Sequence, residues 1–556
     1  MEMKDLYKKY VKETFDENGI IKDLDFDIPD NFNFAYDIID VIGQNEPERK
    51  AMVWVNDKGE EHTFTYRDLS LKSNQCANML LAHGVKKGDM VLSVLKRHYQ
   101  FWILLLALDK IGAIIIPATN QLMKKDYTYR FEAADVNYIV ATADGEVTDH
   151  IEQALEEYKG IKEKFIVRGS RDGWVDFDAE CEKYPSELER IQNNVNDNML
   201  IYFTSGTTGY PKMVVHTHYY CIGHIVTAKY WHKLDENSLH LTISESGWAK
   251  CMWGKMYGQL LCAACLFVYD FDRFHADDIL EKIQDYKVTS FCAPPTMYRM
   301  MIKEGISGYD LSHLERTSIA GEALNPEVFN RWYDLTGLKV MEGYGQTETV
   351  LVIGNMCGME PKAGSTGIPT PLFDIKIYDD DCNEVENGTE GEIVIIPKTK
   401  EKIGLFKEYY KNPEATAEAW RGGVYHTNDL AYKDNDGYFW YVGRKDDVIK
   451  SSGYRIGPFE IESVLMEHPA VLEVAVTGVK DALRGMVVKA TIVLTKAYKD
   501  KGDENLVKEL QEHVKKQTAP YKYPRVIEFV DELPKTISGK IRRVEIRDRD
   551  NNTKHQ

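Results

Sequence analysis

The sequence of 556 residues lacks a hydrophobic run long enough to cross a membrane. Its most apolar stretch, residues 101–107, is followed closely by Asp109 and Lys110, which predicts a buried helix instead. The first five residues, Met-Glu-Met-Lys-Asp, also lack the apolar segment of a secretory signal. We therefore expect a cytoplasmic protein with no stable membrane insertion.

Cysteine is scarce and positive charge is in deficit. The nine cysteines lack the spacing of a disulfide framework, as expected for a reducing compartment. Cys262 and Cys265 are spaced like a redox pair, but the apolar stretch 260–268 around them favours two buried thiols. With 69 Lys and Arg against 88 Asp and Glu, the net charge is −19, which argues against binding to nucleic acid. Such a protein must gather positive charge locally wherever it binds phosphate.

The chain is longer than one hydrophobic core usually serves, so we expect two or more domains. Residues 90–95, 98–111 and 113–117 read as strand, helix and strand, and similar alternation continues towards residue 350. This pattern predicts an α/β fold, in which parallel and mixed sheets are covered by helices.

The pattern changes after about residue 365. Short alternating strands, such as 374–378 and 392–396, predict a β-rich subdomain that ends at residue 443. From residue 444 the chain reads as a separate α+β unit, with strands at 474–479, 488–494 and 526–530 and a helix at 504–516. We predict an N-terminal domain of residues 1–443 and a mobile C-terminal domain of residues 444–556.

One stretch, residues 202–212, is typical of a phosphate-binding loop. Its sequence is Tyr-Phe-Thr-Ser-Gly-Thr-Thr-Gly-Tyr-Pro-Lys, and it follows an apolar run that reads as a strand. Glycines allow backbone N–H groups to turn inward, and Lys212 adds a cation. Gly206 and Gly209 are too close together for a Walker A loop. Taken alone, the stretch is equally compatible with a mobile surface loop.

Several later motifs end in polar residues. Residues 321–323 and 342–348 each follow a predicted strand, and Asp429 and Arg444 follow later in the chain. The stretch 451–457, Ser-Ser-Gly-Tyr-Arg-Ile-Gly, and the stretch 533–543, which contains Lys540, belong to the predicted C-terminal domain. Considered one at a time, these are ordinary turns or solvated charges.

In this order and wording, the motifs resemble those of the adenylate-forming superfamily over roughly the whole chain. Residues 451–458 and 518–524 are most similar to its medium-chain acyl-CoA synthetases. The resemblance implies two reactions: a carboxylic acid and ATP form an acyl-adenylate and pyrophosphate, and coenzyme A then takes the acyl group and releases AMP. It implies a medium-chain or short branched acid, with ATP, Mg²⁺ and coenzyme A as the other small-molecule partners.

The resemblance also implies roles for the N-terminal motifs. The loop would wrap the β- and γ-phosphates, Tyr344 would stack on adenine, Thr347 would contact the α-phosphate, and Asp429 would bind the ribose hydroxyls with Arg444 beside it. Glu348 and Thr204 would hold Mg²⁺, and Lys212 would assist catalysis. The implied nucleotide-binding set is Thr204, Ser205, Gly206, Thr207, Thr208, Gly209, Gly321, Glu322, Ala323, Glu342, Gly343, Tyr344, Gly345, Gln346 and Thr347. Asn428 stands where the family usually has Gly.

The C-terminal domain would swivel about a hinge near Asp446. In one position Lys540 would bridge the carboxylate and the α-phosphate. In the other, the pantetheine arm of coenzyme A would pass Gly453. The residues implied to contact coenzyme A are Ser452, Gly453, Tyr454, Arg455, Arg484, Lys515 and Tyr523.

For the acyl pocket, the resemblance points to Trp248 and Gly345. Acetyl-CoA synthetases carry a Trp at the position of Gly345, so glycine predicts room for longer acids. Lys250 is unexpected there, and it either points outward or shortens the pocket. Two other functions remain open at this stage: loading of a separate carrier-protein thiol, and nucleotide binding by a regulator without catalysis.

Overall fold

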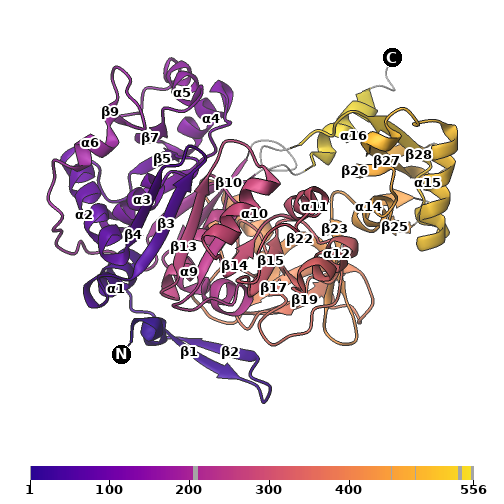
Figure 1. Ribbon diagram of the computed structural model, residues 1–556, viewed down its shortest axis with the longest axis horizontal. Coiled ribbons are helices and arrows are strands. Elements are labelled where there is room, and N and C mark those ends of the chain that lie inside the picture. Colours follow the sequence, from indigo (N-terminus) through magenta and orange to yellow (C-terminus); the bar gives the residue numbers. More distant parts are fainter. Residues whose placement is uncertain (1, 205–210, 452–453, 482–483, 536–540, 553–556) are drawn as a thin grey trace.

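The computed structural model describes residues 2–204, 211–451, 454–481, 484–535 and 541–552, and its strands form five sheets (Figure 1). Two large sheets with their helices make up most of the chain, so the predicted α/β fold is confirmed. Among the described residues, no helix is both long enough and apolar enough to span a membrane.

The first large sheet has eight strands, and its centre is parallel. In spatial order the strands are β21 (Glu408–Tyr409), β11 (Lys212–Thr217), β10 (Asn198–Thr204), β6 (Ile114–Pro117), β5 (Met90–Val94), β7 (Tyr138–Thr142), β8 (Glu163–Val167) and β9 (Val175–Asp176). The predicted strand, helix and strand are β5, α3 (Gln100–Ile111) and β6. Gly112 ends α3 in the left-handed conformation, with φ 72°, which glycine adopts without strain.

The second large sheet has nine strands, from β18 (Ile368–Pro369) through β17 (Ile353–Gly354), β16 (Val340–Tyr344), β15 (Arg316–Ala320), β14 (Ser290–Cys292), β12 (Leu239–Thr242), β13 (Cys265–Asp270) and β3 (Lys50–Asn56) to β4 (Glu61–Thr65). Strands β16 to β3 are parallel. Ligands bind at the carboxyl ends of such strands, and the predicted motifs 321–323 and 342–348 lie there, after or at the end of β15 and β16.

Helices cover both large sheets. Their bounds are α1 (Val41–Asn45), α2 (Tyr66–Ala82), α4 (Lys124–Ala134), α5 (Val147–Leu155), α6 (Phe177–Cys181), α7 (Tyr219–Gly223), α8 (Lys250–Lys255), α9 (Tyr257–Leu261), α10 (Ala276–Asp285), α11 (Pro295–Glu304), α12 (Pro326–Thr336) and α13 (Pro413–Ala419). An N-terminal hairpin of β1 (Val11–Phe15) and β2 (Ile21–Phe26) projects from the body (Figure 1).

Two smaller sheets complete the chain. The antiparallel sheet of β19 (Phe373–Tyr378), β20 (Gly391–Pro397), β22 (Tyr425–Lys433) and β23 (Phe439–Arg444) precedes the C-terminal sheet of β24 (Ile449–Ser451), β25 (Tyr454–Ile456), β26 (Val471–Asp481), β27 (Gly485–Leu494) and β28 (Val526–Val530). The latter packs with α14 (Pro458–Met466), α15 (Glu504–Gln517) and α16 (Arg543–Asn552). A hydrogen bond connects the N-terminal part of the chain with the C-terminal part: Asn325 Nδ2 donates to the Ser463 carbonyl at 3.2 Å.

Candidate active site

The phosphate-loop motif connects β10 to β11. These two strands are antiparallel, and Thr204 and Lys212 are the last pair of their ladder. The residues between them that the sequence singled out, Ser205, Gly206, Thr207, Thr208 and Gly209, lie outside the described residues. Thr204 and Lys212 therefore stand side by side at the base of the connection.

Lys212 begins a row of three side chains. Its Nζ lies 4.8 Å from the ring centroid of Tyr409, and the Tyr409 hydroxyl donates to Glu348 Oε1 at 2.9 Å. Burial raises the pKa of Glu348, while the Tyr409 hydroxyl, Arg444 and Lys212 act in the opposite direction. The row joins β11, β21 and the loop after β16, so a cation and a carboxylate predicted from separate motifs do converge.

Asp429 lies at the centre of a hydrogen-bonded cluster. Its Oδ2 accepts from the Tyr344 hydroxyl and from Gln346 Nε2, each at 2.7 Å, and its Oδ1 accepts from the Tyr441 hydroxyl at 3.2 Å. Arg444 is its cross-strand neighbour on β23. Burial raises the pKa of Asp429, and the positive charge of Arg444 opposes that rise. The cluster brings together three residues that the sequence predicted for one nucleotide.

Asn428, which replaces the family's usual glycine, adopts φ 57°. This is the left-handed region, which Asn tolerates better than most residues. The departure from the family pattern is therefore compatible with the same backbone conformation.

The turn after β15 rests on a buried carboxyl group. Gly321 has φ 99°, and Glu342 on the neighbouring strand accepts from the Leu324 N–H at 3.1 Å. Glu342 is 4% exposed, and burial raises its pKa to about 8. Its carboxyl group thus binds the turn from inside the protein. Glu322 and Ala323 are half-buried beside Gly321.

The space in front of Gly345 is filled by Trp253. A Cβ placed on Gly345 would lie 2.3 Å from Cη2 of Trp253, which is 6% exposed. The Trp253 Nε1–H donates to the Thr349 carbonyl at 3.2 Å. Lys250, one turn earlier on α8, donates from Nζ to the Ala320 carbonyl at 2.9 Å. Trp248 precedes α8 and is half-buried.

The predicted coenzyme A residues are placed only in part. Ser452 and Gly453 lie outside the described residues, as does Lys540, which was predicted for the adenylation step, and the Arg455 side chain is likewise not described. The rings of Tyr454 and Tyr521 stack at 4.0 Å between centroids. Lys515 and Arg525 both lie over the Tyr523 ring, at 4.3 Å and 4.7 Å from its centroid. The Arg484 N–H donates to Asp481 Oδ1 at 2.9 Å.

Sequence reasoning missed Tyr409, Tyr441 and Trp253. Tyr409 and Tyr441 lie in short strands whose partners only the fold reveals. Trp253 could have been found, because a helix that starts at Lys250 places residue 253 on the same face.

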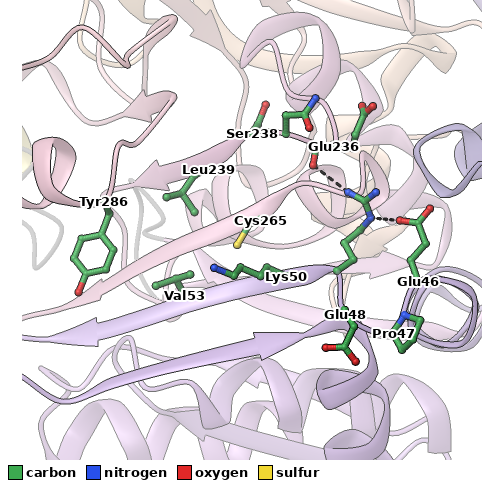
Figure 2. Close-up of a pocket in the computed structure, with 12 residues that line it drawn as sticks. Glu46, Pro47, Glu48, Lys50, Val53, Glu236, Ser238, Leu239, Cys265 and Tyr286 are labelled. Atoms are coloured by element: carbon green, nitrogen blue, oxygen red, sulfur yellow. Dashed lines mark hydrogen bonds and ion pairs between the residues drawn. The ribbon is translucent and has the colours of Figure 1, made fainter.

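A separate surface pocket of about 660 Å³ lies at the opposite, amino-terminal ends of β3, β12 and β13 (Figure 2). Lys50, Leu239 and Cys265, the first residues of these strands, line it. Arg49 also lines it and donates to the Glu236 carbonyl at 3.0 Å. Because it lies at the opposite ends of the strands, this pocket is not part of the site around Glu348 and Asp429.

Comparison with known proteins identifies the class. Residues 40–410 match the AMP-binding enzyme family, and residues 460–540 match the AMP-binding enzyme C-terminal domain. Acyl-coenzyme A synthetase ACSM3, mitochondrial, of Mus musculus is 41% identical over 98% of this chain and 96% of its own length. ACSM4 of Homo sapiens is 42% identical over 94% and 91%.

Solved structures agree in fold. The anthranilate CoA ligase AuaEII in complex with anthranoyl-AMP has a TM-score of 0.86 and 27% identity, over 95% of this chain and 99% of its own. A benzoate CoA ligase from Burkholderia xenovorans has a TM-score of 0.81 and 26% identity, over 93% and 100%.

The chain therefore belongs to the AMP-binding enzyme family, among its acyl-CoA synthetases. The predicted superfamily and enzyme class are confirmed: the protein is an acid–thiol ligase that uses an acid, ATP and coenzyme A. Membership of this enzyme class excludes the alternative that the protein is a nucleotide-binding regulator without catalysis.

Proposed function

We propose that this acyl-CoA synthetase acts on a medium-chain or short branched carboxylic acid. The observation that supports a limit on the size of the acid is the Trp253 indole, which occupies the space that Gly345 leaves. An acyl chain that ran past Gly345 would meet this ring, so the ring would limit the length of a straight medium-chain acid, and a short branched acid would lie beside it. We propose Trp253 as the pocket wall, together with the predicted Trp248.

We propose that ATP binds between the row of Lys212 and Glu348 and the cluster around Asp429. A carboxylate offers about four acceptor positions, and three donors occupy Asp429, so a ribose hydroxyl can still bind. Two anions must meet in the first reaction, which is why Lys212, Arg444 and the predicted Lys540 are needed to offset negative charge.

Mg²⁺ fits Glu348. Tyr409 occupies Oε1, and no other side chain among the described residues donates to this carboxylate. Mg²⁺ is usually bound by one or two carboxylates together with substrate phosphates, and a single protein carboxylate with the Thr204 hydroxyl nearby on the hairpin suits that mode. When bound, the ion would offset charge that develops on the phosphate oxygens.

Glu342 has a supporting role in this proposal. Its carboxyl group is buried and binds Leu324, so it holds the turn that carries Gly321, Glu322 and Ala323 in place for adenine.

We propose that the domain boundary lies at residues 443–447, with the hinge at Asp446. Strand β23 ends at Arg444 in one sheet, and β24 begins at Ile449 in another. Asp446 Oδ1 lies 3.3 Å from Arg444 Nε. Rotation at this point would bring Lys540 to the site for the first reaction and the Gly453 face for the second.

The test is carboxylate-dependent ATP–pyrophosphate exchange with straight and branched acids from C2 to C10, followed by AMP release after coenzyme A is added. We expect exchange to peak above C2, and coenzyme A to drive turnover. A peak at C2 would contradict the proposed acid class. Exchange without coenzyme A turnover would instead favour a carrier-protein thiol as acceptor.

We also propose a cytoplasmic location. The nine free cysteines fit a reducing compartment, a description that applies to the mitochondrial matrix as well. The relatives named above are mitochondrial. Fractionation of cells that express the full chain separates the two: recovery with a mitochondrial matrix marker would contradict the proposal.

A further inference from the structure

Three consecutive backbone carbonyls in the loop after β16 are each bound by a donor from outside the loop. The His216 ring donates from Nε2 to Thr347 O at 2.8 Å, the Phe406 N–H donates to Glu348 O at 2.7 Å, and Trp253 Nε1 donates to Thr349 O at 3.2 Å. The middle residue is the carboxylate proposed for Mg²⁺. No sequence motif pointed to any of the three donors, and His216 is the one that lies on the strand that begins at Lys212.

The neighbours of His216 fix its ring. It lies on β11 four residues after Lys212, and side chains on a strand alternate, so both side chains are on the same face of the sheet. The His216 ring is fully buried and stacks on Tyr220, with 3.8 Å between centroids. A carbonyl can only accept, so the proton is on Nε2. Burial lowers the pKa of His216 to about 4, which keeps this neutral form at ordinary pH.

The peptide between Thr347 and Glu348 links His216 to the carboxylate. In a trans peptide the carbonyl and the following N–H point in opposite directions. Because His216 holds the Thr347 carbonyl on one side, the Glu348 N–H is directed to the other. The Nδ1 atom of His216 has no partner among the described residues, so the bond to Thr347 is the polar anchor of this ring.

We propose that His216 is a positioning residue for adenylation: its bond to the Thr347 carbonyl fixes the Thr347–Glu348 peptide and thereby orients the Glu348 carboxylate towards the metal and phosphates. The proposal rests on the function proposed above for Thr347 and Glu348. Because the His216 ring is fully buried and acts through the Thr347 carbonyl, we expect its effect in the first half-reaction and in the response to Mg²⁺.

The experiment compares H216F, H216Q and H216N with H218F. Phe keeps the stacked ring and removes the donor. The amide of Gln can reach the position of Nε2, and that of Asn, one methylene shorter, cannot. His218 is the matched control: it is also buried and lies two residues further along, and no bond from it to the loop is present among the described residues.

We expect H216F and H216N to lower the rate of ATP–pyrophosphate exchange about ten-fold, the worth of one hydrogen bond, and to raise the half-saturating Mg²⁺ concentration. H216Q should retain exchange within about three-fold, again less than one such bond. H218F should match the unmodified protein. Thioester formation from a supplied acyl-adenylate should be unchanged in all four variants.

Equal losses in H216Q and H216N, or equal loss of both half-reactions, would overturn the proposal, because either result means that His216 only supports folding. Melting temperatures report on folding, and the comparison of H216Q with H216N stands even if H216F does not fold. The variant E348Q distinguishes failure of the proposed metal site from failure of the inference about His216. Normal exchange in E348Q would refute the proposed metal site itself, whereas lost exchange in E348Q with normal exchange in H216N would refute only the inference about His216.

Discussion

Replacement of Trp253 by Leu should shift the acid preference towards longer chains. The Trp253 ring lies against Gly345, and a smaller side chain would leave apolar space there. Each methylene that enters such space contributes about 0.8 kcal/mol, so an acid two methylenes longer should gain about 15-fold in kcat/KM relative to a short acid. Loss of the 3.2 Å bond to Thr349 should cost every acid about 1 kcal/mol, or about five-fold.

The assay is kcat/KM for straight acids from C4 to C10, expressed as the ratio of C6 to C4, two acids that differ by two methylenes. The matched control is Trp253→Phe, which keeps most of the ring and loses the N–H. It should lower activity with all acids without changing the ratio much. If Trp253→Leu and Trp253→Phe gave the same ratio as the unmodified protein, Trp253 would not bound the acyl chain, and the pocket would have to be sought elsewhere.

Three further predictions follow from single side chains. Lys540→Ala should abolish ATP–pyrophosphate exchange but leave thioester formation from a supplied acyl-adenylate nearly intact; equal loss of both would refute the division of work between two domain positions. Tyr409→Phe removes the hydrogen bond that lowers the pKa of Glu348, so the acid limb of the pH–rate profile should move to higher pH, and an unchanged limb would contradict this. Glu342, whose pKa is raised to about 8, stays protonated in the folded protein while the unfolded chain ionises, so stability should fall as pH rises from about 4.5 to about 8. Glu342→Gln should therefore flatten the melting temperature across that range, and an unflattened curve would show that Glu342 titrates normally.

The sequence predicted best the helices and strands that are determined by the hydrophobic pattern of their own residues. The strand predicted at 526–530 is β28 without change, and the helix predicted at 504–516 is α15, one residue longer. The helix predicted at 98–111 begins two residues later, at Gln100, because His98 turns inward to Asp270 and Thr142 instead. Ends of elements depend on such tertiary contacts, which a single sequence does not contain.

The sequence predicted individual residues of the site but not the contacts among them. Asp429, Tyr344 and Gln346 were each named for the nucleotide, but the bonds among them depend on where β16 and β22 meet. The pocket prediction was incomplete for the same reason: glycine at 345 indicated space, and Trp253, from a helix about ninety positions earlier in the chain, fills it. Such long-range packing follows from sheet order, which periodicity does not specify.

The pairing of β3 with β13 has a consequence for synthesis of the protein. β3 ends at Asn56, yet one of its two neighbours begins only at Cys265. At translation rates of about 5–20 residues per second, the ribosome needs roughly 10–40 s to make the missing strand. During that time the hairpin of β3 and β4 has an open edge of largely apolar residues, which is a template for wrong pairing. The nascent chain is therefore expected to depend on chaperones over this interval, and pauses of the ribosome before residue 270 should lower the yield of folded enzyme.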